Sequence, residues 1–404
     1  MPKYPFDPAH LDAYPEPLAE LAREYELQAL KEIADRIKIA GQMNEVTVQM
    51  IRTLRARGID LKDIKKAIQE WAGISEKDLN KMLDDVIERN QKYYAEVIDL
   101  AKITKPAYLV DERDIEAIRR QTLDTFRNIT QSMGFSVKGR ATLLPVAKAY
   151  QWALDKALTQ VESGGISYNQ AIDNALRELA DGGLCVAKDK DGNILKNRVK
   201  YESGHIDHLD VAIRRAVMTG VNQVNQRYRE QSMEYLETDL VEVTAHLGAR
   251  NIDGPKGWEN HAKWQGKVYR IKDKPHTSKG QYDYLENVCG YGDVQGIGGA
   301  NCRHSFHPFI EGVMERTYTD KELEAMKPEN KPKIVFEGRE YDDYQATQKQ
   351  RQIEREIRKW KRRKAVADGD EKAAAGARIK RLNAKYKVFS AAAGLPEQRE
   401  RMIA

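Results

Sequence analysis

Residues 240–310 contain most of the side chains in this sequence that could bind a metal ion or transfer a proton. Five of the eight histidines and two of the three cysteines fall in this segment: His246, His261, His276, His304, His307, Cys289 and Cys302. Zinc accepts mixed cysteine and histidine ligands in a tetrahedron. Because side chains two residues apart on a strand point to the same face, Cys302 and His304 would face one site. One candidate is therefore a zinc site formed by His246, His261, Cys302 and His304.

A second interpretation of these residues needs no metal. The four side chains lack the paired short spacings of common zinc modules. Loops with few aliphatic residues can instead be held by hydrogen bonds between buried polar side chains. We expect such a hydrogen-bonded knot and no cofactor, and zinc binding stays open as the alternative. The knot would comprise His261, Trp264, Asn301, Cys302 and His304.

The chain lacks the sequence motifs of common hydrolases. It contains no HExxH, GxSxG or GxxxxGK[ST] pattern, and the acidic residues near the histidines show no fixed ligand spacing. The stretch GYGDVQGIGG resembles a phosphate-binding loop only in its glycine content, and we expect a tight connection there with positive φ angles. We therefore expect no catalytic residues. A metal-dependent nuclease or hydrolase is the alternative.

Positive charge is concentrated near the C-terminus. The net charge of the chain is +5, yet residues 349–364 contain nine cations against Glu354 and Glu356, so the remainder is slightly acidic. Such a segment can bind the phosphates of double-stranded DNA without reading sequence. The alternative is a solvated helix that packs through Ile353, Ile357 and Trp360. The candidate DNA-binding residues are Lys349, Arg351, Arg355, Arg358, Lys359, Lys361, Arg362, Arg363 and Lys364.

Helices must position most of these side chains, because apolar residues recur at helical spacing over most of the first 235 residues. We expect helices that end at Gly41, Gly58 and Gly73. A capping box of Ser75 and Asp78 predicts the start of a long fourth helix. Further helices are expected over 111–134, 141–164, 167–182 and 209–228.

Strand patterns are short and lie between turn residues. Asp191-Gly192 predicts a hairpin, and three β-like runs flank long loops at 241–244, 268–271 and 303–309. A further strand pair is expected within 334–344, followed by two helices joined at ADGDE. The predicted fold class is α+β and predominantly α-helical, with an N-terminal helical arm, a small central α+β domain with long loops, and a basic C-terminal helical hairpin.

Length and composition predict several units in a chain of 404 residues. No apolar run is long enough to span a bilayer and the first ten residues lack a signal-peptide core, so we expect no membrane partner. Three cysteines without a CxxC pair predict reduced thiols. The expected units are the N-terminal arm 1–110, connecting helices 111–164, the central domain 165–310, a linker 311–345 and the basic hairpin 346–404.

Ten residues of the central domain follow a recognisable order: His246, Arg250, His261, Trp264, Gln265, Gly266, Asn301, Cys302, Arg303 and His304. This order resembles that of the phage minor capsid protein 2 family, which is similar to the wider Mu F-type head morphogenesis domain. The wider pattern has Asn-Cys-Arg-Cys, whereas His304 stands in place of the second cysteine here. The narrower family commonly shows that replacement. The resemblance covers nearly the whole chain and is strongest over 205–400.

The resemblance implies a structural component of a bacteriophage or prophage head, not an enzyme. It implies a minor capsid protein at or near the portal vertex that assists procapsid assembly, DNA packaging or DNA ejection. The implied partners are the portal protein, other head proteins and non-specifically bound double-stranded DNA. The implied location is the virion, after assembly in the host cytoplasm. Because the capped helices of the first 110 residues form an expected separate unit, we predict that this arm docks on the portal. A nuclease or hydrolase and a non-specific nucleic-acid-binding module remain the alternatives.

Overall fold

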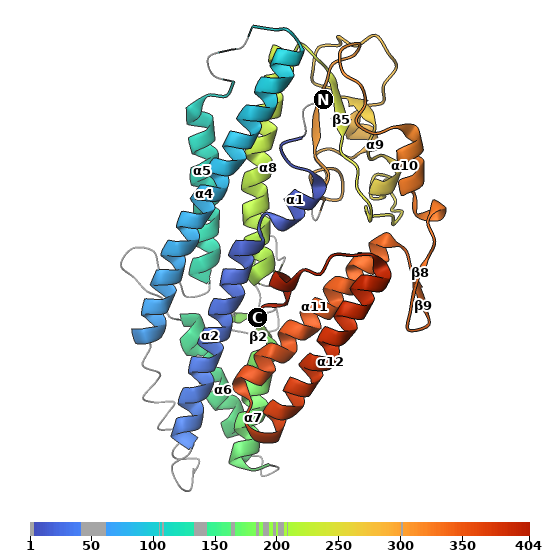
Figure 1. Ribbon diagram of the computed structural model, residues 1–404. Coiled ribbons are helices and arrows are strands. Elements are labelled where there is room, and N and C mark those ends of the chain that lie inside the picture. The colour runs from blue at the N-terminus through green and yellow to red at the C-terminus, as the bar shows by residue number, and fades with distance from the viewer. Residues whose placement is uncertain are drawn as a thin grey trace.

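The computed structural model describes most of the chain as a predominantly helical α+β fold, which confirms the predicted class (Figure 1). The predicted helix at 44–58 and the turn at Asp191-Gly192 lie outside the described residues. None of the helices described is long and apolar enough to cross a membrane. The described residues are 4–41, 62–104, 106, 109–132, 144–162, 166–182, 186–188, 194–196, 199–200, 206–207, 209–299 and 302–404.

Four long helices run side by side and form the main body (Figure 1). They are α2 (Glu16–Gly41), α4 (Lys62–Leu100), α5 (Glu112–Ser132) and α8 (Leu209–Tyr235). Helix α8 contacts the other three, because apolar residues at helical spacing give it a wide buried face that includes Val217, Val221 and Val224. This helix leads the chain directly into the loop-rich sheet.

One predicted helix boundary is wrong. Helix α4 continues through Gly73 and Ser75, so the expected stop and the expected capping box both lie inside a helix. A glycine within a helix costs about 1 kcal/mol relative to alanine. That cost is small beside the burial of the apolar residues that follow, such as Leu79, Leu83 and Val86. Packing on α2 and α8 therefore overrides the local signal.

Shorter elements cover one end of the main body. Helices α6 (Leu144–Glu162) and α7 (Tyr168–Gly182) pack on each other, and the predicted Ser167 cap accepts a hydrogen bond from the backbone N–H of Gln170 at 3.3 Å. Strands β1 (Val186–Lys188) and β2 (Ile194–Lys196) pair in antiparallel fashion, which confirms the predicted hairpin. Strands β3 (Val199–Lys200) and β4 (Ile206–Asp207) form a second small pair.

A three-stranded antiparallel sheet lies at the other end of the main body, beside the N-terminus (Figure 1). Its order is β6-β5-β7, with β5 in the centre, so the three predicted β-like runs are confirmed. Strand β5 is buried along its whole length and pairs Leu240 with Arg270 on one side and Phe309 on the other. The strands are β5 (Leu240–Val243), β6 (Val268–Arg270) and β7 (Phe306–Phe309), with short helices η1 (His261–Lys263) and α9 (Leu285–Val288) in the loops.

The C-terminal part ends in the predicted helical hairpin. Helices α11 (Asp343–Val366) and α12 (Gly369–Ala393) pack closely, and α11 also contacts α2 and α7. Asp342 and Gln345 form a capping box at the start of α11. The remaining elements are α10 (Asp320–Met326), η2 (Pro328–Asn330), the predicted strand pair β8 (Ile334–Phe336) and β9 (Arg339–Tyr341), and η3 (Arg399–Met402).

The expected units share one apolar core. The largest buried cluster contains Leu30 and Val97 from the expected arm, Phe126 from the connecting helices and Val221 from the expected central domain. The cluster even includes Val366 at the end of α11. The unit boundaries stay a prediction, but removal of residues 1–110 would expose apolar surface on α8.

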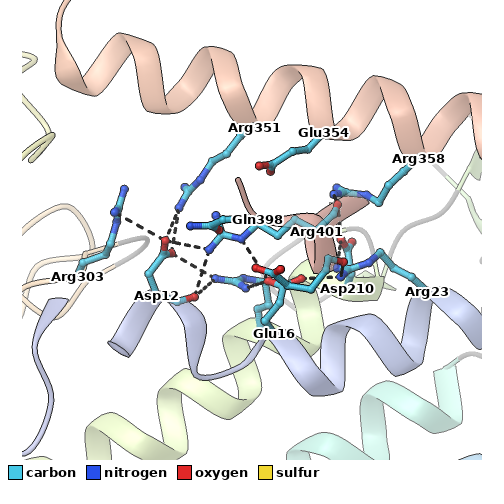
Figure 2. A network of polar contacts seen from close by, with 12 residues as sticks. Asp12, Glu16, Arg23, Asp210, Arg303, Arg351, Glu354, Arg358, Gln398 and Arg401 are labelled. Carbon is cyan, nitrogen blue, oxygen red and sulfur yellow. Dashed lines mark hydrogen bonds and ion pairs between the residues drawn. The ribbon is translucent and has the colours of Figure 1, made fainter. Parts of the chain in front are cut away.

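A network of buried and partly buried arginines and carboxylates connects distant segments of the chain (Figure 2). At its centre lies Asp12 of helix α1 (Pro8–Ala13), whose side chain is only 12% exposed. Its carboxylate accepts hydrogen bonds from Arg401 at 2.9 Å and Arg351 at 3.0 Å, and lies 3.7 Å from Arg303. We call this set the arginine network; it comprises Asp12, Glu16 and Asp210 with Arg23, Arg214, Arg303, Arg351, Arg358 and Arg401.

The members of the arginine network come from six parts of the chain: α1, α2, α8, the segment before β7, α11 and η3. Arg303 precedes strand β7, Arg351 lies on α11 and Arg401 lies in η3. Burial by itself would raise the pKa of Asp12, but these three guanidinium groups outweigh it and hold that pKa below its ordinary value. The network therefore connects the sheet, the C-terminal hairpin and α1 through one ionised carboxylate.

The N-terminal segment also covers His307 of strand β7. The ring of Tyr4 stacks on the His307 ring with centroids 4.3 Å apart, and Tyr93 of α4 meets the same ring edge-on. The Tyr4 hydroxyl donates a 2.6 Å hydrogen bond to the buried Glu242 of β5. His307 is 4% exposed and its Nδ1 has no hydrogen-bond partner within the described part of the chain. A charged imidazolium would be costly in this position.

Loss of the Asp12 charge should destabilise the protein. Asp12→Asn leaves several buried guanidinium groups close together without their shared carboxylate, and breaking a buried ion pair typically costs about 3–5 kcal/mol. Urea denaturation at neutral pH measures the change. The control is Asp7→Asn, because Asp7 is exposed and asparagine is an equally good N-cap for α1. Equal stability of Asp12→Asn and the control would contradict a central role for Asp12.

Protonation of His307 should make stability depend on pH. Burial, followed by the nearby charge of Arg229, lowers the pKa of His307 from 6.5 to about 3. Between these two values the unfolded chain binds a proton that the folded chain does not, so the free energy of unfolding falls as the pH is lowered below 6.5. By pH 4 the loss should reach roughly 3 kcal/mol. Denaturation curves recorded from pH 7 to pH 4 measure it.

The comparison variant is His307→Gln, which should lose less stability over the same pH range than the wild type. His276→Gln is the control, because it makes the same substitution at an exposed histidine. If His307→Gln and the wild type lost stability in parallel, the pH dependence would have to arise at other groups.

Candidate functional site

The loops around the three-stranded sheet bring most of the predicted motif residues together. One potential ligand atom from each of His261, Cys302 and His304 lies within 4.8 Å of the others. The ring of His246 lies beside that of His304, with centroids 4.5 Å apart. His246 follows β5, His261 begins η1, and Cys302 and His304 precede β7. We call these four residues the histidine-cysteine cluster.

Gln265 fixes the orientation of two cluster residues. Its side-chain oxygen Oε1 accepts a hydrogen bond from the backbone N–H of His246 at 3.0 Å, so this atom is an acceptor. The same oxygen lies 3.0 Å from Nε2 of His304. Nε2 of His304 must therefore carry the proton, which leaves a lone pair on Nδ1. That Nδ1 lies 3.6 Å from Cys302 Sγ.

The other two histidines are oriented by backbone carbonyls. Nε2 of His261 lies 2.9 Å from the carbonyl oxygen of Gln295, and Nδ1 of His246 lies 2.8 Å from that of Leu247. A carbonyl oxygen can only accept, so both ring nitrogens are donors. The lone pairs therefore lie on Nδ1 of His261 and on Nε2 of His246.

The indole ring of Trp264 packs against the rings of His261 and His304. Its ring centroid is 4.6 Å from that of His261 and 4.9 Å from that of His304, and its side chain is 1% exposed. Its indole N–H donates to the carbonyl of Trp258 at 2.9 Å, while its own carbonyl accepts from the Tyr269 hydroxyl at 2.8 Å. Trp264 belongs to the small apolar core of the sheet. The cluster is therefore packed against a buried, hydrogen-bonded aromatic side chain.

Burial keeps the imidazoles neutral. It lowers the pKa of His246 and of His261 to about 4, and that of His304 well below its ordinary value. Burial also raises the pKa of the Cys302 thiol. In the absence of another ion these groups form a neutral set of nitrogen and sulfur donors at neutral pH.

The remaining motif residues have different surroundings. Gly266 has a φ of +70°, and a Cβ at this position would collide with Leu323. Arg250 donates to the carbonyl of Gln295 at 3.3 Å, next to His261. Arg303 points away from the cluster and joins the arginine network. Asn301 lies outside the described residues.

Some residues of this site could not be found from sequence patterns. Gln295 acts through its backbone carbonyl, which every residue type possesses. The glycine-rich stretch that contains it forms a tight connection, and Gly290 and Gly292 have positive φ angles as expected. Asp12 lies almost three hundred residues from Arg303, and no local pattern links them.

Four of the nine candidate DNA-binding residues bind groups on other elements of the chain. Arg351 binds Asp12, and Arg358 donates to the carbonyl of Arg401 and pairs with Asp210. At the far end of α11, Arg362 donates to the carbonyl of Ala180 and Arg363 binds Asp181 of α7. These side chains attach α11 to the main body because its apolar face, with Ile353 and Ile357, is already used by α12.

The other five candidates lie closer to solvent. Arg355 and Lys364 are exposed, whereas Lys349, Lys359 and Lys361 are partly buried. Helix α12 lies outside the basic segment 349–364, but it carries further exposed cations. These are Lys372, Arg378, Lys380, Arg381 and Lys387, and no acidic residue occurs between 372 and 387. A shallow groove between α11 and α12 is lined by Lys364, Lys372 and Lys380.

The histidine-cysteine cluster offers nitrogen and sulfur donor atoms to a ligand. Within the part of the chain that the structure describes, His261, Cys302 and His304 are the one group of three or more His, Cys, Asp or Glu side chains close enough to share a metal ion. No carboxylate belongs to that group of described residues.

Comparison with known proteins agrees with the predicted resemblance. The sequence pattern of a family described as phage minor capsid protein 2 matches residues 6–389. A structural protein of Lactococcus phage LL-H is 26% identical over 301 residues, covering 71% of this chain and 70% of that protein. A structural protein of Lactococcus phage mv4 is 33% identical over 87 residues, covering 22% of this chain and 55% of that protein. No solved structure matches. The chain belongs to the phage minor capsid protein 2 family.

Proposed function

We propose that this minor capsid protein is a non-enzymatic component of the phage head that docks at the portal vertex and contacts packaged DNA during assembly, packaging or ejection. Family membership supports a role in the head. The observation that carries the DNA contact is the set of exposed cations on the C-terminal hairpin, beside an otherwise slightly acidic chain.

The DNA-binding surface consists of the exposed end of α11 together with α12. We call it the hairpin cation surface; it comprises Lys364, Lys372, Arg378, Lys380, Arg381 and Lys387, all of which are exposed. The surface does not include four of the candidates predicted from the sequence, Arg351, Arg358, Arg362 and Arg363, because contacts within the chain hold these side chains. Long flexible cations suit a phosphate backbone, and no acidic residue occurs between 372 and 387.

This surface binds DNA without reading its sequence. Lysine contributes a point charge to phosphates, whereas base recognition needs side chains placed in a groove with fixed geometry. Because 3.6 residues per turn spread these cations around part of the helix axis, a single chain offers about four contacts at once, which gives a salt slope of roughly −3.6 on duplex DNA. Several copies around one vertex would bind more tightly through effective concentration. The arrangement fits transient contact with DNA that moves through a portal.

Removal of three lysines should flatten the salt dependence of DNA binding. The variant Lys364→Gln, Lys372→Gln, Lys380→Gln removes the lysines that line the groove between α11 and α12. The slope of log K against log salt should decrease in magnitude by about 2.7, at about 0.9 per lost phosphate contact, on unrelated DNA sequences alike. Fluorescence anisotropy with labelled duplexes measures it.

The control removes the same charge elsewhere. Lys92, Lys321 and Lys333 are exposed and lie on α4, α10 and the loop before β8. Their joint replacement by glutamine should leave the slope close to that of the wild type. Equal slopes for both triple variants would exclude the hairpin cation surface as the DNA contact.

The portal location makes a separate prediction about incorporation into heads. When this protein is present during assembly, heads formed from the portal, scaffold and major capsid proteins of the same phage should contain it in a few copies. Heads assembled without the portal should lack it, while the major capsid protein is present in both. Quantitative mass spectrometry of purified heads measures the ratio. Equal incorporation with and without the portal would place the protein on the shell lattice instead.

A further inference from the structure

We propose that His261, Cys302 and His304 bind one zinc ion, with His246 as the fourth ligand. The inference is independent of portal docking and of DNA binding. It rests on the distances between the donor atoms, on the direction of their lone pairs and on the small apolar core around them.

The spacing of the donor atoms matches zinc coordination. Zinc binds histidine nitrogen at ~2.0–2.1 Å and cysteine sulfur at ~2.3 Å, so the two atoms of a tetrahedral site lie about 3.6 Å apart. Cys302 Sγ and Nδ1 of His304 are 3.6 Å apart. The most widely spaced pair of the three donors is within 4.8 Å, so a contraction of about 1 Å completes the set.

The lone pairs are prepared for a metal by hydrogen bonds to the opposite ring nitrogens. His304 donates from Nε2 to Gln265, and His261 donates from Nε2 to the Gln295 carbonyl. Metal-binding histidines in proteins almost always make such a bond, which sets the tautomer and the ring orientation. The Nδ1 atoms of both rings are therefore available as ligands without loss of a proton.

His246 completes the tetrahedron from the solvent side. Its Nδ1 bonds to the Leu247 carbonyl, so Nε2 carries the free lone pair, and its ring lies beside that of His304. His246 is partly buried, whereas His261 and His304 are 2% and 4% exposed. On binding, the Cys302 thiol releases its proton to solvent and forms the Sγ–zinc bond.

The fold around the cluster gives the ion a structural purpose. About sixty residues separate β5 from β7, and the sheet has only a small apolar core that includes Val241, Trp264 and Phe306. One ion would join the segment after β5, helix η1 and the segment before β7. Zinc commonly stabilises loop-rich regions of this kind, because its binding free energy adds directly to the free energy of folding.

The full chain, produced without a histidine tag, should contain about one zinc per molecule by elemental analysis. After removal of zinc, titration with Co²⁺ should produce the d–d bands of a tetrahedral site together with a thiolate-to-cobalt charge-transfer band. Cys302→Ser should lose the charge-transfer band. Cys289→Ser is the control and should retain it, because Cys289 is a buried thiol that is not part of the ligand group.

Gln265→Leu tests the tautomer argument without removing a ligand. Loss of the hydrogen bond to His304 should weaken zinc affinity by about 10–100-fold, measured by competition with a chromogenic chelator. A chelator should also lower the melting temperature of the wild type but not that of Cys302→Ser. Absence of zinc and of any cobalt charge-transfer band in the folded wild type would overturn the proposal in favour of a metal-free hydrogen-bonded knot. A zinc content unchanged in Cys302→Ser would assign the metal to other groups.

Discussion

The ionised carboxylate of Asp12 is the contact on which the arrangement of the other parts depends. It lies on a six-residue helix near the N-terminus and binds arginines from the segment before β7, from α11 and from η3. None of these guanidinium groups could be buried so close to the others without a shared anion, because like charges at low dielectric repel strongly. The N-terminal segment is therefore part of the tertiary core. Phe6 and Leu11 of this segment are buried in the same cluster as residues of α8.

The long loops around the sheet are held in one conformation although the apolar core there is small. Its central strand is fully buried, but the connections are long and contain many glycines. Polar side chains substitute for aliphatic ones: Gln265 accepts two hydrogen bonds, and Trp264 and Tyr269 use both their rings and their polar groups. Each buried polar atom that finds a partner avoids a desolvation cost of about 1–3 kcal/mol. A bound zinc ion would act in the same direction, since it would add bonds between segments that share few apolar contacts.

The basic hairpin shows why a charge count along a sequence is an incomplete guide to a surface. A helix of 24 residues distributes its cations around the whole axis, and one side of α11 faces the carboxylates and carbonyl oxygens of α1, α7 and η3. Arginines on that side bind groups of the main body and so hold the hairpin against it. The cations that reach solvent are mostly on α12, which has a lower charge density in the sequence but fewer partners in the structure.

By itself, the sequence determined the helical fold class, the three strands around the central loops, the β1–β2 hairpin and the α11–α12 hairpin, because these depend on local periodicity and turn residues. It also determined the membership of a phage head family, because that depends on a motif of fixed order. Only the tertiary structure decided which motif residues act together. It separated Arg303 from Cys302 and His304, although they are neighbours in the chain, because alternate side chains of an extended segment face opposite sides. It also carried α4 through Gly73, since burial of a long apolar face outweighs the preference of one residue. Asp12 and the Gln295 carbonyl had no sequence signal, because their roles arise from long-range packing and from a backbone group common to every residue.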